Sequence, residues 1–171
     1  GRKGSFMADN HINIAALELL YKPWEEPNQH RTRAEKVGDP AVIQKGRAPS
    51  KITIVNNLRH ELDQWRSHDY PGASDTTREL LNHWFLRDHL LTNGEGVPQE
   101  FRYYFCQREA IEAFIYLMEV RQKRSLSALV AEFGGENAET AALGITETED
   151  LWPRFAFRVA TGAGKTKIMS L

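Results

Sequence analysis

The chain has 171 residues, of which 41% are hydrophobic and 26% are charged, and its formal net charge at pH 7 is −1. This length suits one domain, or one domain with a piece of another. The charge excludes a global basic field of the kind that attracts nucleic acid, but it does not exclude a local basic patch with that role. No apolar run approaches the roughly 20 residues of a membrane span, no signal peptide is visible, and the single cysteine, Cys106, excludes an internal disulfide. These features predict a cytoplasmic protein without a membrane partner.

Residues 1–49 are predicted to form an extended N-terminal arm. Residues 1–6 precede Met7, so we read them as a remnant of cloning and Met7 as the natural start, and modest helical periodicity follows over residues 9–20. Four prolines and many charges leave residues 21–49 without a stable period. The basic side chains of this stretch suit either a solvated surface or contacts with nucleic-acid phosphates. They are Arg31, Arg33, Lys36, Lys45 and Arg47.

Residues 50–98 are predicted to form a region of two helices. A strong helix is expected to begin at Ser50, and a Pro-Gly pair is expected to end it. Thr76 and Glu79 have the spacing of a capping box, which starts the second helix there. The apolar residues at helical spacing are Ile54, Val55, Leu58, Leu62 and Trp65 in the first helix, and Leu80, Leu81, Trp84, Phe85 and Leu86 in the second.

A short turn between two helices favours their packing against each other, so this region is expected to be a helical hairpin. Its tryptophans are expected to lie in the core rather than on a surface that stacks bases. Residues 92–98 contain two glycines and a proline and predict a loop. Residues 99–171 then carry the chemical motifs.

Residues 100–120 combine an aromatic, extended stretch with an apolar helix, and Gln107 stands at the junction. A side-chain amide has one acceptor oxygen and two donor hydrogens, so it can pair bidentately with the N6 and N7 edge of adenine. A lone glutamine is a weak signal, but upstream of a phosphate-binding loop it becomes a candidate adenine reader. The apolar side of the helix comprises Ala110, Ile111, Phe114, Leu117 and Met118.

Residues 121–152 separate this helix from the last motif. A short helix is predicted near the start of this insert, ended by a Gly-Gly pair. Its apolar residues are Leu126, Leu129, Val130 and Phe133. An acidic connection rich in alanine and threonine follows at residues 136–150, and no function follows from it.

The last motif is the glycine-rich stretch GAGKT at residues 162–166, preceded by residues 155–159, which predict a short strand. Glycines let backbone N–H groups approach a triphosphate, Lys165 is placed to reach its β- and γ-phosphates, and the Thr166 hydroxyl is placed to ligate Mg²⁺. A helix is expected to open at Gly164 with its positive end toward the anion. The order of strand, loop and helix favours a phosphate-binding loop over a chance glycine turn.

Two stretches together resemble a known family. FCQREAIEAFIYL, residues 105–117, and FRVATGAGKTKIM, residues 157–169, resemble the start of the superfamily 2 helicase-like ATPases of the DEAD/DEAH-box group. More narrowly, they are similar to the Res-subunit branch of type III restriction enzymes, as is the helical stretch over residues 59–85. The chain departs from the pattern at Val159, where the general loop has glycine, and in the long separation between the glutamine and the loop.

The resemblance implies a mainly α chain whose helical N-terminal region precedes the start of an α/β P-loop domain of the RecA-like type. It implies ATP and Mg²⁺ as cofactors and nucleic acid as the track, with DNA expected ahead of RNA. Subunits of a restriction or phage-defence complex are the implied protein partners. The implied catalytic pair is Lys165 and Thr166, with Thr166 as the Mg²⁺ ligand. The implied cofactor-binding set is Gln107, Thr161, Gly162, Ala163, Gly164, Lys165 and Thr166.

The sequence contains no acidic DExx box, no arginine finger from a second lobe and no nuclease motif. We therefore expect the chain to be the N-terminal part of a longer ATP-dependent helicase or translocase, with no ATP turnover by itself. Whether the longer enzyme cuts nucleic acid is left open. The alternative is a non-catalytic helical module that binds DNA or protein and for which ATP is irrelevant. In either case residues 155–159 lack partner strands and would form an unpaired apolar edge.

Overall fold

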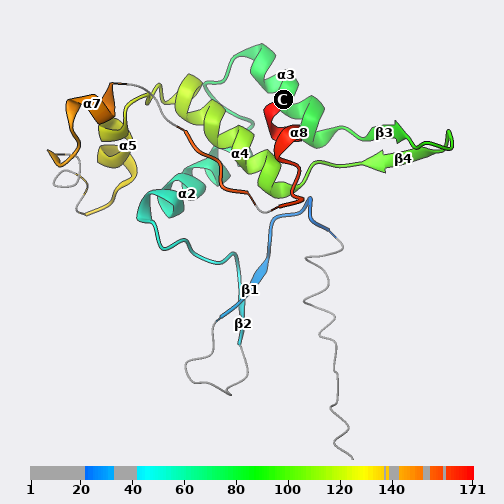
Figure 1. Ribbon diagram of the computed structural model, residues 1–171, viewed down its shortest axis with the longest axis horizontal. Coiled ribbons are helices and arrows are strands. Elements are labelled where there is room, and N and C mark those ends of the chain that lie inside the picture. Colours follow the sequence, from blue (N-terminus) through cyan, green and yellow to red (C-terminus); the bar gives the residue numbers. More distant parts are fainter. Residues whose placement is uncertain (1–21, 33–41, 137, 139–142, 152–154, 160) are drawn as a thin grey trace, which may run out of the picture.

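The computed structural model describes residues 22–32, 42–136, 138, 143–151, 155–159 and 161–171 (Figure 1). The predicted cloning remnant and the helix at 9–20 lie outside these residues. The described part is mainly helical, with two small antiparallel sheets. Its helices are α2 (Thr53–Ser67), α3 (Asp75–Leu86), α4 (Phe105–Ile115), α5 (Leu126–Phe133), α7 (Glu147–Asp150) and α8 (Lys165–Met169), and a π-helical turn, η1 (Tyr116–Val120), continues α4. Its strands are β1 (Gln29–Arg31), β2 (Ile43–Lys45), β3 (His89–Thr92) and β4 (Pro98–Phe101).

Helix α2 begins at Thr53, three residues later than the pattern predicted. The delay has a local cause, because the Ser50 backbone pairs with a side chain. The Ser50 N–H donates to Asn56 Oδ1 at 2.7 Å, and Asn56 Nδ2 donates to the Ser50 carbonyl at 2.8 Å. The predicted hairpin is also corrected, because α2 packs chiefly on α4 and α5 rather than along α3.

Helix α3 starts at a different cap from the one predicted. Ser74 is its N-cap, and the Ser74 hydroxyl accepts the N–H of Thr77 at 3.2 Å. Glu119, on η1, accepts the Ser74 N–H and the Thr77 hydroxyl, both at 2.7 Å. Thr76 therefore lies inside the helix, and its expected capping box is wrong.

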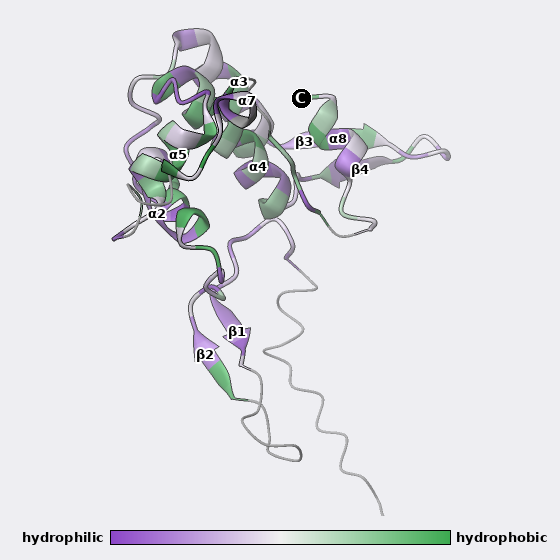
Figure 2. Cartoon of the chain, turned by 60° about the vertical axis from the view of Figure 1, so that its left-hand side comes forward, coloured by the Kyte–Doolittle hydropathy of each residue, from purple (hydrophilic) through white to green (hydrophobic). Residues whose placement is uncertain are grey.

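The β3–β4 hairpin occupies the region predicted as a loop and projects from the helical body (Figure 1). His89 pairs with Phe101 at its base, and the turn proper is limited to residues 93–97. The Asn93 side-chain oxygen accepts the N–H groups of Glu95 and Val97 at 3.0 and 2.9 Å, so one asparagine organises the turn. The β1–β2 ribbon is the second sheet, and Figure 2 shows β1 as hydrophilic throughout.

The core lies where α2, α3 and α4 meet. Leu62 and Leu81 are almost fully buried, and Trp65 is 4% exposed, as predicted for the tryptophans of these helices. Trp84 is half-buried and packs against the core from one side. The helix predicted in the insert is confirmed as α5, and Asn57 on α2 donates to its Phe133 carbonyl at 2.8 Å.

A buried carboxylate ties this core together. Glu112, on α4, has no exposed surface, and it accepts hydrogen bonds from Arg66 Nε at 3.0 Å and Arg108 Nε at 2.7 Å. The Tyr70 hydroxyl, from the turn between α2 and α3, donates to it at 2.7 Å. Two charged partners and one hydroxyl satisfy an acid that would otherwise be very costly to bury. This arrangement fixes α2 against α4.

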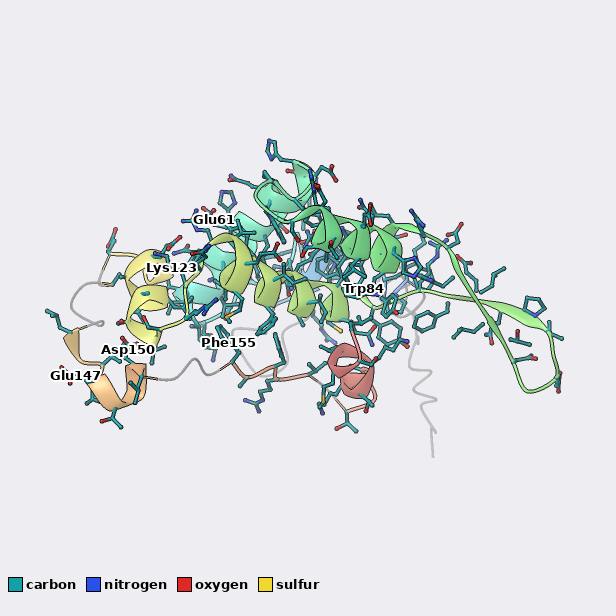
Figure 3. The ribbon with its side chains drawn as sticks, turned by 90° about the horizontal axis from the view of Figure 1, so that it is seen from above. Glu61, Trp84, Lys123, Glu147, Asp150 and Phe155 are labelled. Carbon is teal, nitrogen blue, oxygen red and sulfur yellow. The ribbon has the colours of Figure 1, made fainter. Side chains whose placement is uncertain are left out.

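The predicted strand at residues 155–159 is not formed, because no other strand in the described part runs beside it. The segment is extended and follows α4, where the Phe155 and Phe114 rings lie 5.6 Å apart (Figure 3). Phe155 and Val159 pack on the core, while Phe157 stays 45% exposed. The mainly helical part of the fold prediction stands, and the start of a RecA-like domain stays a prediction.

Candidate functional site

The glycine-rich loop lies against the N-terminal end of α4. Gly162 and Gly164 have φ values of +83° and +74°, in the left-handed region that glycine enters without strain. Gly164 is the N-cap of α8, and Ile168 anchors that short helix in the core. The helix has five residues, so we assign no anion-binding effect to its dipole. The loop is thus held at one end and open to solvent along the rest.

Gln107 connects this loop to α4. It is 5% exposed, and its Oε1 accepts the N–H of Tyr104, the N-cap of α4, at 2.9 Å. Its Nε2 donates to the Ala163 carbonyl at 3.0 Å, and a second contact to the Gly164 carbonyl is longer, at 3.5 Å. Two features that the sequence marked separately, 56 residues apart, are therefore in direct contact.

The Gln107 amide retains hydrogen-bonding capacity. An amide oxygen has two lone pairs and an amide nitrogen has two hydrogens, and Tyr104 and Ala163 use one of each. The second hydrogen is engaged only by the long contact to the Gly164 carbonyl, and the oxygen keeps its second lone pair.

Gly164 is fixed by this contact as well as by its backbone angle. A Cβ placed on Gly164 would lie 2.3 Å from Gln107 Nε2, well inside the distance at which two atoms can coexist. A Cβ placed on Gly162 would meet nothing within 4 Å. The two loop glycines are therefore required for different reasons, and only Gly164 is required by the glutamine.

A cavity of about 470 Å³ opens beside Gln107. Its volume falls within the roughly 300–1,000 Å³ typical of small-molecule sites. Its lining includes three of the predicted site residues, Gln107, Gly162 and Gly164, but not Thr161, Ala163, Lys165 or Thr166. The remaining lining residues are Trp24, Glu100, Phe101, Arg102, Tyr104 and Lys167.

Sequence reasoning missed Trp24 and Lys167. The Phe105 N–H donates to the Pro23 carbonyl at 2.8 Å, which docks this part of the arm on α4, and the Arg102 guanidinium lies 5.5 Å from the Trp24 ring centre. Lys167 Nζ lies 5.4 Å from the ring centre of Tyr103. No periodic pattern marks Trp24 in its proline-rich surroundings. Lys167 had a signal, because it stands two residues after Lys165 at the opening of the predicted helix.

Lys165 and Thr166 are exposed at the start of α8. The Thr166 hydroxyl is therefore accessible to a cation. Within the described residues, no group of three His, Cys, Asp or Glu side chains is arranged to hold a metal ion. Mg²⁺ fits this site only when a nucleotide supplies phosphate oxygens, which is its usual mode of binding.

The arm contributes fewer free cations than its sequence suggested. Arg47 forms a two-pronged ion pair with Glu109 on α4 and lies 3.8 Å from Glu26, so its charge is used within the chain. Arg31 and Lys45 are exposed on the β1–β2 ribbon. The other two basic residues of the predicted phosphate-contacting set, Arg33 and Lys36, lie outside the described residues.

Two pKa shifts near α4 limit the chemistry available there. Burial raises the pKa of the Cys106 thiol, and backbone N–H groups oppose this only in part, so the thiol stays protonated at neutral pH and is no activated nucleophile. Burial, with the nearby charge of Asp63, likewise raises the pKa of Glu26. Neither shift favours the charged form of its group.

Comparisons of the chain with protein-family models, with curated proteins and with solved structures find no match. No helix of the described part combines the length and apolar character needed to cross a bilayer.

Proposed function

We propose that the cavity beside Gln107 binds ATP with Mg²⁺, and we call it the nucleotide cavity for that reason. We further propose that the chain is the N-terminal part of an ATP-dependent DNA helicase or translocase of a restriction or phage-defence system. The observation that carries this proposal is the hydrogen bond from Gln107 Nε2 to the Ala163 carbonyl. It joins a candidate base reader to a candidate phosphate loop beside a cavity of suitable size. A cytoplasmic location is part of the same proposal.

The roles follow from where each group lies. Gln107 offers its remaining lone pair and hydrogen to the adenine edge, and the Trp24 and Tyr104 rings supply aromatic surface to the same cavity. Lys167 lines the cavity, and Lys165 is the exposed cation of the loop; both are available for phosphate oxygens. The bound Mg²⁺ would neutralise phosphate charge, with the Thr166 hydroxyl as its protein ligand.

Titration of fluorescent ADP and GDP analogues into the chain tests the proposal. Gln107→Ala removes a bidentate contact worth about 1–3 kcal/mol by analogy with base readout in DNA, so adenine affinity should fall relative to guanine affinity. Gln64→Ala, an exposed glutamine on α2, is the matched control and should change neither. Lys165→Ala should lower the affinity for both nucleotides, because it removes a contact to phosphate rather than to the base.

Two outcomes would contradict this reading. Equal loss of both nucleotides in Gln107→Ala would mean that the glutamine only holds the loop. Absence of nucleotide binding by the unmodified chain would favour the alternative of a non-catalytic module that binds DNA or protein.

A further inference from the structure

A second, smaller cavity lies next to the nucleotide cavity, at the end of α3 from which β3 leads off; Figure 3 places Trp84 there. Its volume is about 150 Å³. A cavity of roughly this volume accommodates one aromatic ring such as benzene. It is too small for a whole nucleotide. We call it the ring pocket.

Aromatic side chains form about half of the ring pocket lining, and the rest is mostly charged. Trp84 and Phe85 come from α3, Tyr103 from the segment after β4, and Trp24 from the docked arm. The Phe85 and Tyr103 ring centres are 5.5 Å apart at an interplanar angle of 80°. The His89 ring meets Tyr103 edge-on at 5.8 Å and is fixed by a contact between its Nε2 and the Trp84 carbonyl at 3.2 Å. Such walls present ring faces and edges to an entering planar group.

Arginines surround these rings, and they differ in how far their charge is already used. Arg108 is committed to Glu112 and Tyr70, and Arg102 pairs with Glu100 at 2.5 Å. Arg87 caps the C-terminus of α3, is exposed, and has no ion pair or side-chain hydrogen bond with any residue that the structure describes. The pocket lining therefore includes one guanidinium, that of Arg87, without an ion-pair partner among the described residues, and one carboxylate, that of Asp88, which lies 4.0 Å from Arg102.

We propose that the ring pocket takes one unstacked base of a single-stranded nucleic acid, with a neighbouring phosphate on Arg87. Aromatic surfaces combined with guanidinium groups are the chemistry by which proteins hold single strands without reading their sequence. The choice of a nucleic-acid ligand rests on the proposed function, while the ring-sized slot and the free cation are independent of it. Trp24 and Arg102 line both cavities, so a base in the ring pocket would share a wall with the bound nucleotide.

The two cavities can be tested separately because most of their lining differs. Arg87→Ala alters the lining of the ring pocket alone, whereas Gln107→Ala alters the lining of the nucleotide cavity alone. Tyr103 lines only the ring pocket, although its ring also lies 5.4 Å from Lys167 Nζ of the nucleotide cavity. Tyr103→Phe keeps the ring and removes only the hydroxyl. Arg78→Ala removes an exposed arginine from the other end of α3, where it pairs with Asp75, and is the matched control for charge.

The experiment measures binding of labelled single strands to the full chain by fluorescence anisotropy. The strands are an oligothymidylate, an oligouridylate and an abasic strand of the same length and charge. Because stacking of one base typically contributes about five-fold or more to affinity, strands with bases should bind more tightly than the abasic strand by about that factor. Tyr103→Leu should abolish this difference and Tyr103→Phe should retain it. Arg87→Ala should weaken the binding of all strands and make that binding less dependent on salt concentration. Arg78→Ala should change neither property.

Equal binding of abasic and base-containing strands, or no binding of any strand, would overturn the inference. A second outcome would also overturn it: Arg87→Ala lowers the affinity for the fluorescent ADP analogue by the same factor as the affinity for the strands. The ring pocket would then belong to the nucleotide site. Base-dependent binding by a chain that does not bind ADP would support the ring pocket and reject the proposed ATP function, so the two failures are distinguishable.

Discussion

Two junctions on α4, five residues apart, hold different parts of the molecule in different ways. At Glu112 a buried carboxylate is surrounded by Arg66, Arg108 and the Tyr70 hydroxyl, and it fixes the helical body. At Gln107 a neutral amide holds the glycine-rich loop through one hydrogen bond of normal length. Charged, buried networks are costly to break, whereas one neutral hydrogen bond contributes only about 0.5–1.5 kcal/mol.

Stability and ligand binding therefore depend on different residues of the same helix, Glu112 and Gln107. The loop beyond Gln107 is mostly exposed and is anchored in the core by Ile168, whereas Glu112 is fully buried. Substitutions at Glu112 should therefore lower the stability of the fold, and substitutions at Gln107 should lower the affinity for a ligand.

The largest expected effect is from Glu112→Ala. Removing the carboxylate leaves Arg66 and Arg108 as partly buried charges without their shared partner, which should lower the free energy of unfolding by about 3–5 kcal/mol. Asp63→Ala removes the exposed partner of the same Arg66 and should cost less than about 1 kcal/mol. Urea denaturation at neutral pH measures both. Similar losses in the two variants would mean that the buried carboxylate is not what fixes the body.

A smaller effect is expected from alkaline pH. Burial, reinforced by the charge of Glu112, raises the pKa of Tyr70 to about 12, and Arg108 only partly opposes this. The folded state therefore favours the protonated phenol. Its contribution to stability is complete below the unfolded pKa of about 10 and is lost as the pH rises through about 12.

The variant that isolates this contribution is Tyr70→Phe. The stability advantage of the unmodified chain over Tyr70→Phe should shrink by about 2–3 kcal/mol between roughly pH 10 and pH 12, on the scale of 1.36 kcal/mol per pKa unit. Paired urea titrations across that range measure it. A constant difference between the two proteins would show that the hydroxyl does not stay protonated in the buried network.

The smallest expected effect, and the one that sharpens the comparison most, comes from the loop glycines. Both Gly162→Ala and Gly164→Ala place a side chain at positive φ, but only Gly164→Ala forces the Gln107 amide away. Because that hydrogen bond is lost, the affinity for the fluorescent ADP analogue should fall roughly five- to ten-fold more in Gly164→Ala than in Gly162→Ala. Unfolding free energies should stay within about 1 kcal/mol of each other. Equal nucleotide affinity in the two variants would mean that Gln107 does not position the loop.

Local signals predicted several elements well. The apolar spacing around Leu129 and the Gly-Gly pair after it located α5, and the glycine-rich motif located the start of α8 to within one residue. The β3–β4 hairpin was missed although Asn93-Gly94 is a known turn signal. Reading residues 92–98 as a loop counted the turn and ignored its strands.

Other boundaries depended on contacts between distant residues. Ser74 and Thr76 both suit an N-cap, and Ser74 caps α3 in the structure, where Glu119 also accepts its N–H. Nothing near Ser74 in sequence reveals that partner. The docking of Pro23 and Trp24 on α4 is equally invisible, because a backbone hydrogen bond to Phe105 fixes it.

The helical character of the body and the glycine turn of the loop follow from the sequence, because apolar spacing, caps and glycines act over a few neighbouring residues. Three facts became visible only in the tertiary structure. Gln107 contacts Gly164, Arg47 is paired with Glu109, and Trp24 lines both cavities. These facts depend on how helices pack, and packing is set by the whole buried surface at once rather than by any local pattern.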